Sequence, residues 1–435
     1  MTVIEKAQAR KGVFYGWWVA GAMVILFSAC STANVLPTIL YPFLAAELGL
    51  TASNLGLVTS VWTTLLMVWP LAVGPLLDKL GSRKVLLAGS VLTAAGTALF
   101  STARGLTQMV LYHGVLLSLA GAMTMAIPTF LLLRKWFNKK AGIVTGAVMA
   151  FQGLAGAVLY PVLGRIAAAS GWRPTVAWTG LIASALSFGV TLLVVRESPE
   201  EMGLNPDGVS TEELQRMQAA MGQKVATMSH MTLPQALRTP QFWLSGLVGG
   251  ATIAVLIALT MQATPLAMSV GLAGAAATAA MSSYYLTSVV GKLAVGYLGD
   301  KIGKRLTIQI SCALMALVSA WAWLNLKSPS SLQVVLALGG LFTVATSVLG
   351  TPFLGDLFGV MHLGKISGIY SLLSGALSGL GPVLAGRMAE STGSYSLFFL
   401  VSAVIYLLAV IGVFFVRPTS VELHNAGANT KLKTS

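Results

Sequence analysis

Lys292 is the residue of this chain whose surroundings most directly suggest chemistry. It lies within a long apolar stretch, eight residues before Asp300, which places it about 12 Å along a helix from the polar end of that stretch. A charge at this depth is costly unless it faces water or has a counter-ion. The thirteen acidic residues all lie in polar loops or at the ends of apolar stretches. An anion from outside the chain is therefore the partner that the sequence favours, although a lysine can also extend its stem toward the polar boundary.

Uncharged polar side chains in the apolar stretches could complete a site around this lysine. Tyr285 and Ser288 precede Lys292 by seven and four residues, so the three share one face of a helix. Each polar residue could instead form a helix-to-helix hydrogen bond, worth about 0.6 kcal/mol in a membrane. As a group they predict a mostly apolar cavity with few donors, which suits a small organic acid. The further candidates for its lining are Asn34, Tyr41, Gln152, Tyr160, Gln262, Tyr370 and Ser374.

A cluster of glycine, acidic and basic residues occurs twice, 222 residues apart. Each copy lies between two apolar stretches, and two copies in register predict a chain of two related halves. The alternative is a pair of solvated turns whose surface ion pairs are worth about 0–1 kcal/mol each. The copies read Gly74-Pro-Leu-Leu-Asp78-Lys79-Leu-Gly81-Ser-Arg83-Lys84 and Gly296-Tyr-Leu-Gly-Asp300-Lys301-Ile-Gly303-Lys304-Arg305.

The composition is that of a membrane protein. The 435 residues are 56% hydrophobic and only 9% charged, with a mean hydropathy of +0.81, whereas about a quarter of a soluble protein is charged. The apolar stretches are long enough to cross a hydrocarbon core of about 30 Å as helices. They are continuous rather than alternating, which excludes a transmembrane β-barrel. We therefore expect an all-α polytopic membrane protein.

The hydropathy pattern predicts twelve transmembrane helices in two bundles of six. Residues 1–196 would form the first bundle, 197–239 a polar linker, and 240–435 the second bundle with a short tail. Ser210 and Glu213 predict the start of a short linker helix over 211–221. The expected spans are 16–46, 53–78, 84–103, 107–134, 141–168, 173–196, 240–268, 274–299, 305–325, 330–357, 364–389 and 395–416.

The basic residues predict the orientation of these spans. Of the 27 Lys and Arg residues, 21 fall in loops on one side, Lys365 among them; five fall on the other side, and the remaining one is Lys292. Such a bias predicts that both termini and the linker are cytoplasmic. It also accounts for the net charge of +14, because the charges follow loops beside an anionic lipid leaflet rather than a surface for nucleic acid.

Catalytic, metal and redox chemistry have no support in the sequence. Cys30 and Cys312 both lie inside apolar stretches, where packing is a more common role than a disulfide or a metal site. The spans contain no clustered acid–base or metal-ligand set, and the chain has no Gly-x-x-x-x-Gly-Lys-[Ser/Thr] loop for ATP. We therefore expect neither an enzyme nor a cofactor or metal.

Both charged loops approximate the pattern G-x-x-x-D-x-x-G-R-[KR], and the chain thereby resembles the major facilitator superfamily. In that family the loop joins helices 2 and 3, and again helices 8 and 9. The resemblance implies two pseudo-symmetric six-helix bundles that alternately expose a central cavity. It also implies that Asp78 with Arg83, and Asp300 with Arg305, form cytoplasmic latches that favour the outward-facing state. Such latches would gate transport rather than bind its substrate.

Further motifs resemble the oxalate/formate antiporter and monocarboxylate porter branch of that family. There an arginine four residues before the signature glycine binds the substrate carboxylate; Lys292 lies four before Gly296 and keeps the charge without the planar fork. Ser374 stands where the oxalate type has a second cation, and Ser288 stands where proton-coupled animal porters have an aspartate. The motifs begin at Phe14 (Phe-Tyr-Gly-Trp-Trp), Arg134 (Arg-Lys-Trp-Phe), Glu201 (Glu-Met-Gly-Leu-Asn-Pro-Asp-Gly), Leu237 (Leu-Arg-Thr-Pro-Gln-Phe-Trp) and Asp356 (Asp-Leu-Phe-Gly).

These features predict a monomeric secondary active transporter in the cytoplasmic (inner) membrane that moves a small organic anion. One deep cation suits a monocarboxylate better than a dianion. The alternative is an exporter of apolar or amphipathic compounds, but His113-Gly114 occupies the place of the arginine motif that proton-driven drug antiporters carry in span 4. A proton or a counter-anion could be the coupling partner, and the sequence does not distinguish uptake from export, or symport from antiport or uniport.

Overall fold

The computed structural model describes residues 14–138, 140–216, 231–359 and 361–416. Within these ranges the chain consists of helices and short connections, with no strand. Most helices are apolar around much of their circumference, as expected of helices that contact lipid on one side and other helices on the other.

The first six spans run from Gly16 to Leu193. The second span bends by 45° between its two helices, at a Pro70 that cannot donate a helical hydrogen bond. A π-helical segment, η1, lies in the fourth span. The elements are α2 (Gly16–Asn34), α3 (Leu36–Ile39), α4 (Tyr41–Leu48), α5 (Ala52–Val68), α6 (Pro70–Leu80), α7 (Ser82–Ser101), α8 (Leu106–Met109), η1 (Val110–Leu117), α9 (Ser118–Thr124), α10 (Ala126–Trp136), α11 (Ala141–Ser170) and α12 (Trp172–Leu193).

A linker then leads to six further spans. It holds the short helices η2 and η3 and a helix at 211–216; residues 217–221 of the predicted linker helix lie outside the described ranges. The elements are η2 (Pro199–Met202), η3 (Pro206–Gly208), α14 (Leu233–Leu237), α15 (Pro240–Met261), α16 (Ala263–Ser269), α17 (Gly274–Ala279), α18 (Met281–Ile302), α19 (Lys304–Asn325), α20 (Pro329–Phe342), α21 (Ala345–Phe358), α22 (Leu363–Thr392) and α23 (Ser396–Phe415).

The predicted all-α fold with twelve spans is confirmed, with boundaries within a few residues of those expected. By length and composition, ten of the described helical stretches can each cross a membrane, and the bent pair α5–α6 is an eleventh. The pair α17–α18 completes the twelve. It is the span that carries Lys292 together with Tyr285 and Ser288, and these polar residues lower its hydropathy.

Glycines at helix ends repeat between the halves. At these positions the backbone has a positive φ, which only glycine adopts without strain. Each glycine ends one helix and lets the next helix start in a new direction, so the repeat in the sequence is also a repeat of turns. The pairs, each 222 residues apart, are Gly49 (φ 63°) with Gly271 (93°), Gly81 (80°) with Gly303 (90°), and Gly171 (86°) with Gly393 (67°).

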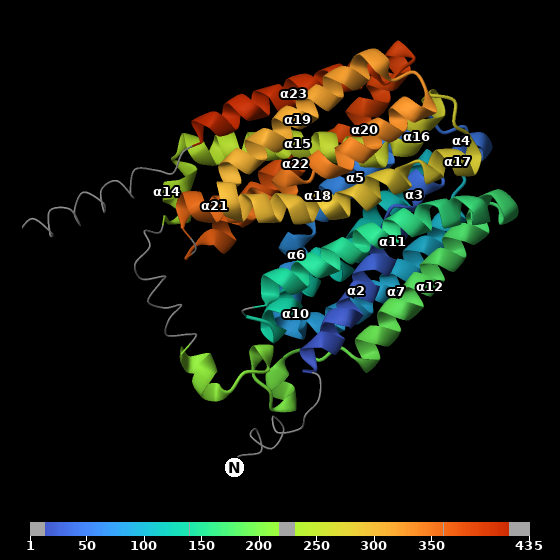
Figure 1. The fold of residues 1–435 in the computed structure, drawn as a ribbon. Helices are drawn as coiled ribbons and strands as arrows, with labels where there is room; N and C mark the ends of the chain where they lie inside the picture. The colour runs from blue at the N-terminus through green and yellow to red at the C-terminus, as the bar shows by residue number, and fades with distance from the viewer. Residues whose placement is uncertain (1–13, 139, 217–230, 360, 417–435) are drawn as a thin grey trace, which may run out of the picture.

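The two halves lie side by side with their spans running between two ends of the molecule (Figure 1). We call the end with α6, α10, α14 and α21 the linker end, and the end with α4, α16 and α17 the far end. The contacts between the halves run mainly along two pairs of helices, α5 with α22 and α11 with α18. These two seams are the elements that position the candidate site.

Candidate functional site

Both seams are closed toward the far end through glycines. A β-carbon on Gly153 of α11 would lie 2.9 Å from Val289 of α18. On α22, a β-carbon on Gly375 would lie 2.4 Å from Met67, and one on Gly386 would lie 2.6 Å from the Ala52 carbonyl oxygen. Such distances leave no room for a larger side chain. The close approach of the helices at the far end therefore depends on these glycines.

The same two glycine stripes are open toward the linker end. Gly142 and Gly146 on α11, and Gly364 and Gly368 on α22, have no atom within 4 Å of the place of a β-carbon. Gly142 and Gly364 are 222 residues apart, and so are Gly146 and Gly368. Each stripe thus continues along one face of its helix from a packed part to an unpacked part. The halves are joined at the far end and separate toward the linker end.

Hydrogen bonds between the halves reinforce the closed far end. The Gln262 side-chain amide donates to the carbonyl oxygens of Ala52 and Pro382, each at 2.9 Å, which ties the first half to the second. The backbone N–H of Ser53 donates to the carboxylate of Glu390 at 2.8 Å. Because Ser53 lies in the first turn of α5, the positive end of the helix favours this carboxylate.

A cavity of about 660 Å³ occupies the open part of the α5–α22 seam. Its wall comes from α5, α6, α9, α10, α14 and α22, and it is mainly apolar. Among the described residues that line it, Lys365 is the one charged side chain. The charge pattern of the sequence counts Lys365 with the loop charges, whereas it lies in the first turn of α22.

Lys292 lies at the level where the α11–α18 seam begins to open. Its Nζ is 3.4 Å from the carbonyl oxygen of Met149 on α11, between the packed Gly153 and the unpacked Gly146. Such a bond is long and therefore weak. Lys292 makes no ion pair with any described residue. The deep cation expected from the sequence is thus present between the halves without an acidic partner.

Three of the predicted polar residues accompany Lys292 on this seam. The hydroxyls of Tyr160 and Tyr285 are 3.1 Å apart and come from different halves. Ser288 is buried one turn from Lys292, and its hydroxyl lies 3.5 Å from the place of a β-carbon on Gly153. Gln152 is half-buried beside Gly153. The structure therefore places Tyr160, Tyr285 and Ser288 on the same seam as Lys292, and Gln152 on the neighbouring part of α11.

Three other candidates lie away from the cavity. Gln262 takes part in the far-end closure described above, and Tyr41 begins α4 at the far end. Asn34 is bound within the first half, where it accepts a hydrogen bond from Trp62 at 3.1 Å; it lies behind Gly121, a residue of the cavity wall. None of the three lines the cavity, because Gln262 and Tyr41 lie at the closed far end and Asn34 is bonded to Trp62 inside the first half.

Tyr370 and Ser374 also point elsewhere than expected. The Tyr370 hydroxyl lies 2.0 Å from the place of a β-carbon on Gly249 and 3.3 Å from that on Gly350. Ser374 is buried against Gly250, whose β-carbon would lie 3.0 Å from the Ser374 Cα. Both residues therefore face α15 and α21 inside the second half. The face of α22 that meets the first half is the glycine stripe.

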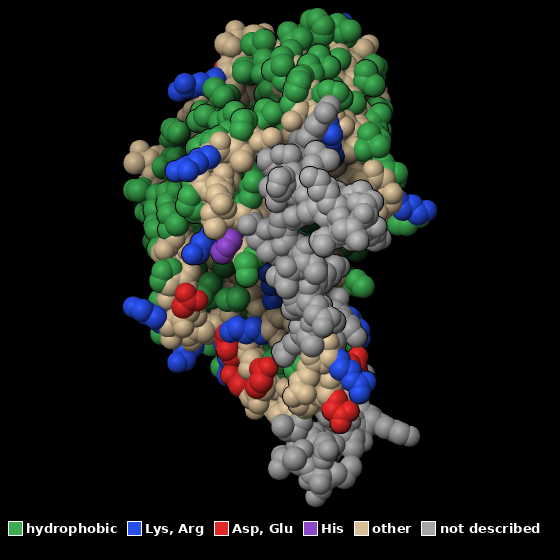
Figure 2. Space-filling view, turned by 90° about the vertical axis from the view of Figure 1, so that its left-hand side faces the viewer, with side chains coloured by type: hydrophobic (Ala, Val, Ile, Leu, Met, Phe, Trp, Pro, Cys, Tyr) green, Lys and Arg blue, Asp and Glu red, His purple; other side chains and the backbone are tan. Residues whose placement is uncertain are grey.

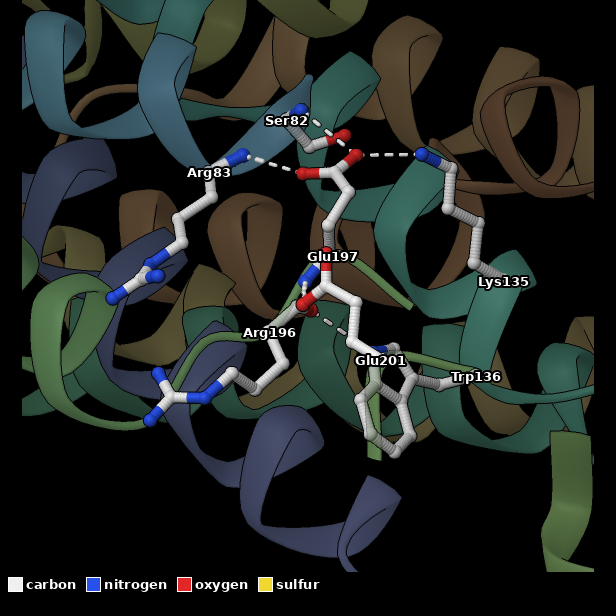
Figure 3. A network of polar contacts seen from close by, with 7 residues as sticks. All are labelled: Ser82, Arg83, Lys135, Trp136, Arg196, Glu197 and Glu201. Atoms are coloured by element: carbon white, nitrogen blue, oxygen red, sulfur yellow. Dashed lines mark hydrogen bonds and ion pairs between the residues drawn. The ribbon is translucent and has the colours of Figure 1, made fainter. Parts of the chain in front are cut away.

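Glu197, a residue that no sequence motif marks, organises the first charged loop (Figure 3). Its carboxylate accepts the backbone N–H groups of Ser82 and Arg83, each at 2.9 Å, and lies 2.5 Å from the Lys135 Nζ. Burial alone would raise the pKa of Glu197, but the bonds from Lys135, Arg83 and Ser82 outweigh it and lower the pKa. The carboxylate therefore caps α7 and joins it to α10 and the linker.

The expected Asp–Arg latches are not formed in this conformation. Asp78 and Asp300 are exposed at the linker end and have no ion pair within the described ranges. Arg83 donates instead to the carbonyl oxygen of Leu192 at 2.7 Å. Arg305 donates to backbone carbonyls in the last turn of α23. In each half the arginine is thus occupied by backbone carbonyl oxygens of that same half, and neither aspartate has an ionic partner among the described residues.

The second charged loop has a different ion pair. Lys304 Nζ lies 2.6 Å from the Asp356 carboxylate at the end of α21. Lys304 is in the first turn of α19, the counterpart of α7. One half therefore caps its helix with a carboxylate, whereas the other joins the corresponding helix to α21 through a side-chain pair.

Known proteins resemble this chain along nearly its whole length. A probable sulfoacetate transporter of Cupriavidus necator is 25% identical over 416 residues, which cover 92% of this chain and 93% of the relative. Human monocarboxylate transporter 7 is 21% identical, covering 96% and 90%. The oxalate:formate antiporter of Oxalobacter formigenes is 24% identical, covering 79% and 78%.

A solved structure and a family model agree with these relatives. The crystal structure of a bacterial homologue of the human lysosomal transporter Spinster shares the fold, with a TM-score of 0.68, 14% identity, and coverage of 93% of this chain and 97% of that one. The model of the Major Facilitator Superfamily matches residues 21–279 and 249–434. With that match over both halves, this multi-pass membrane protein belongs to the Major Facilitator Superfamily.

Proposed function

We propose that this transporter moves a small organic anion, most simply a monocarboxylate, across the membrane by alternating access. The observation that carries the proposal is Lys292, which lies between the halves and has no acidic partner among the described residues. A cation that is desolvated and unpaired gains from an anionic ligand more than a solvated cation does, because the local dielectric is low. The carboxylate of the substrate would supply the missing counter-charge.

The neighbours of Lys292 suit the rest of such a substrate. Tyr160, Tyr285 and Ser288 carry hydroxyl groups on the same seam, within about two turns of Lys292, and Gln152 would add an amide from α11. A ligand held by groups of both halves would couple its binding to the relative position of the halves. The single deep cation favours a monoanion at this place.

The alternation itself would exchange the packed and open parts of each seam. Residues 1–196 and 240–435 would move as two bodies connected by 197–239. In the opposite state Gly364 and Gly368 would pack against α6. Asp78 would then approach the positive N-terminus of α22, and Asp300 would approach that of α11. We assign Asp78 and Asp300, with Arg83 and Arg305, to this gating.

The relatives support a small organic anion as cargo. Three of them are named for sulfoacetate, monocarboxylates, and oxalate with formate, which share an acidic group and small size. The planar fork of an arginine is missing at Lys292, so a point-charge contact with one or both carboxylate oxygens is the contact we expect.

The orientation would place the linker end in the cytoplasm. Figure 2 shows this face, with Lys and Arg side chains spread over it and acidic side chains gathered in its lower part. An excess of basic residues on one side favours that side as cytoplasmic. The described conformation would then be inward-facing, in the cytoplasmic membrane.

A second candidate is export of apolar or amphipathic compounds. It is favoured by the lining of the 660 Å³ cavity, where Lys365 is accompanied mainly by apolar residues such as Leu66, Met67 and Ile127. A lipophilic compound could bury much of its surface there. This candidate requires no contact with Lys292.

Counterflow in proteoliposomes separates the two candidates. Purified protein would be tested with labelled formate, acetate, lactate and oxalate, and with a lipophilic cation. We expect exchange of a monocarboxylate, its loss in Lys292→Gln, and partial retention in Lys292→Arg. Loss of the contact between Lys292 and the anion should weaken the free energy of anion binding by about 2–5 kcal/mol, which lowers the affinity at least about 30-fold.

Lys84→Gln is the matched control, because Lys84 is an exposed lysine at the linker end. Its removal changes the net charge equally without touching the seam. Exchange of monocarboxylates by Lys292→Gln at the rate of the parent would contradict the anion proposal. Exchange of the lipophilic cation alone would establish the second candidate.

A further inference from the structure

Lys365 lies at the wall of the cavity and has no ionic partner among the described residues. It lies in the first turn of α22, is exposed, and lines the cavity together with Gly368 and Ser371. Two other linker-end lysines are paired, Lys135 with Glu197 and Lys304 with Asp356. Lys365 has neither a hydrogen bond nor an ion pair from its side chain to any described residue.

The surroundings of Lys365 make this part of the wall electropositive. A lysine in the first turn of a helix adds to the positive charge of the helix N-terminus instead of offsetting it. Gly364 and Gly368 on either side leave the helix surface uncovered, because no atom lies within 4 Å of the place of a β-carbon on either. A small anion could therefore approach the Lys365 ammonium group without displacing a side chain.

Ser371 lies deeper than Lys365 along the same wall of the cavity. Ser371 is exposed to the cavity two turns into α22. Ser371 corresponds in the repeat to Met149, which lies 222 residues earlier. The carbonyl oxygen of Met149 is the group that Lys292 contacts. By this repeat, Ser371 on one seam and the Lys292 ammonium group on the other lie at corresponding depths between the halves.

We propose that Lys365 and Ser371 form a capture site, where a small organic anion binds transiently at the mouth of the cavity before it reaches Lys292. The site deepens, and rests on, the proposed transport of an anion. Lys365 raises the local concentration of anions and thereby sets the apparent affinity at the linker end. Because Lys365 is exposed, its effect is screened by salt, whereas binding at Lys292 is screened less.

The local potential can be measured without any transported substrate. A single cysteine in place of Ser371 would be reacted in detergent solution with an anionic and with a neutral methanethiosulfonate of similar size. The native Cys30 and Cys312 are buried and would be replaced by alanine. The ratio of the anionic to the neutral reaction rate reports the potential at this position.

We expect Lys365→Gln to lower this ratio by about 3–10-fold at low ionic strength, because one charge supplies only part of the roughly 10–10³-fold that focusing by a whole charged cleft can reach. Lys365→Arg should preserve it, and 1 M salt should abolish the difference. Lys84→Gln is the control, because Lys84 is likewise exposed and is the third residue of a long helix, α7. An unchanged ratio in Lys365→Gln would overturn the capture site.

Counterflow then separates this inference from the proposed function. With a transported anion, Lys365→Gln should raise the linker-side KM about 3–10-fold at low salt, with kcat unchanged. A lowered thiol ratio without transport of any anion would support the electropositive mouth and contradict anion transport. Anion transport with an unchanged thiol ratio would support the transport proposal and overturn the capture site.

Discussion

The two seams between the halves share a framework and differ in chemistry. Both use a glycine stripe that is packed toward the far end and open toward the linker end. The α11–α18 seam carries Lys292 and the tyrosine pair Tyr160 and Tyr285. The α5–α22 seam is instead closed by contacts with backbone atoms, such as the hydrogen bond from the Gln262 side-chain amide to the carbonyl oxygen of Ala52. A duplicated framework can therefore hold its binding groups on one seam and its main far-end closure on the other.

The largest effects are expected from adding a side chain to the packed part or to the open part of the α22 glycine stripe. Gly386→Val would place atoms on the Ala52 backbone, where a β-carbon already lies at 2.6 Å. Overpacking costs about 1–3 kcal/mol, so we expect a shift of roughly 5–150-fold away from far-end closure. Gly368→Val fills space that is open here and should instead hinder closure of the linker end.

Distances between spin labels at Leu80 and Ile302 would report these shifts. Both residues are exposed at the linker end, on α6 and α18. Gly386→Val should increase the share of short distances, and Gly368→Val should decrease it. Gly21→Val is the control, because nothing lies within 4 Å of that position on α2. If Gly386→Val and Gly368→Val changed the share of short distances in the same direction, the packed and open parts of the stripe would not exchange roles between the two states.

A smaller effect is expected from the polar contact of the α5–α22 seam. Gln262→Leu would remove the bonds to Ala52 and Pro382 and the bond from Tyr395. Only the Ala52 bond joins the two halves, and such bonds are worth about 0.6 kcal/mol in membranes. The same labels should therefore show about a threefold shift toward linker-end closure.

Gln309→Leu is the matched control for this variant. The Gln309 amide donates to Val410 at 3.4 Å within the second half, so its loss should leave the distances unchanged. An equal shift in both variants would indicate a general loss of packing. The seam contact of Gln262 would then have no special part in the closure.

The charged loops should contribute the smallest effect, and it should depend on pH. The pKa of Glu197 in the folded protein is lowered below its ordinary value of 4.5. Its stabilisation is therefore fully present above pH 4.5 and is lost as the pH falls through the lowered pKa. Above pH 4.5, Glu197→Gln should lower the Tm by a few degrees, and the difference should shrink below pH 4.

The measurement is a Tm profile of the detergent-solubilised protein from pH 7 to pH 3. Glu200→Gln serves as the control, because Glu200 is an exposed residue of η2 and should show no such profile. A constant Tm difference between Glu197→Gln and the parent over this range would remove Glu197 from the cap of α7.

Much of this fold could be predicted from the sequence, and part of the site could not. Hydropathy and turn glycines locate the spans because both act locally, and the spacing of Tyr285, Ser288 and Lys292 on one helix face is likewise local. The inward orientation of Tyr370 could not be predicted, because an apolar helix gives little sign of its rotation. That rotation is set by packing against other helices, such as the approach of Tyr370 to Gly249.

The roles of Lys365 and Glu197 also depend on parts of the chain that are distant in the sequence. Lys365 is close enough to the end of its span to be counted with the loop, and only the separation of the halves brings it to a cavity wall. Glu197 has its partners 62 to 115 residues away in the sequence. No local pattern reports such contacts. A carboxylate just after an apolar span is a weak sign of them.

Anion-induced thermal stabilisation of the purified protein tests the central claim most directly. A ligand at 100 times its Kd stabilises a protein by about 2.7 kcal/mol. We predict that millimolar monocarboxylates raise the Tm of the parent and of Lys84→Gln, that Lys365→Gln requires higher concentrations at low salt, and that Lys292→Gln shows no rise. Stabilisation of Lys292→Gln equal to that of the parent, or no stabilisation of the parent by any of these anions, would contradict an anion site at Lys292.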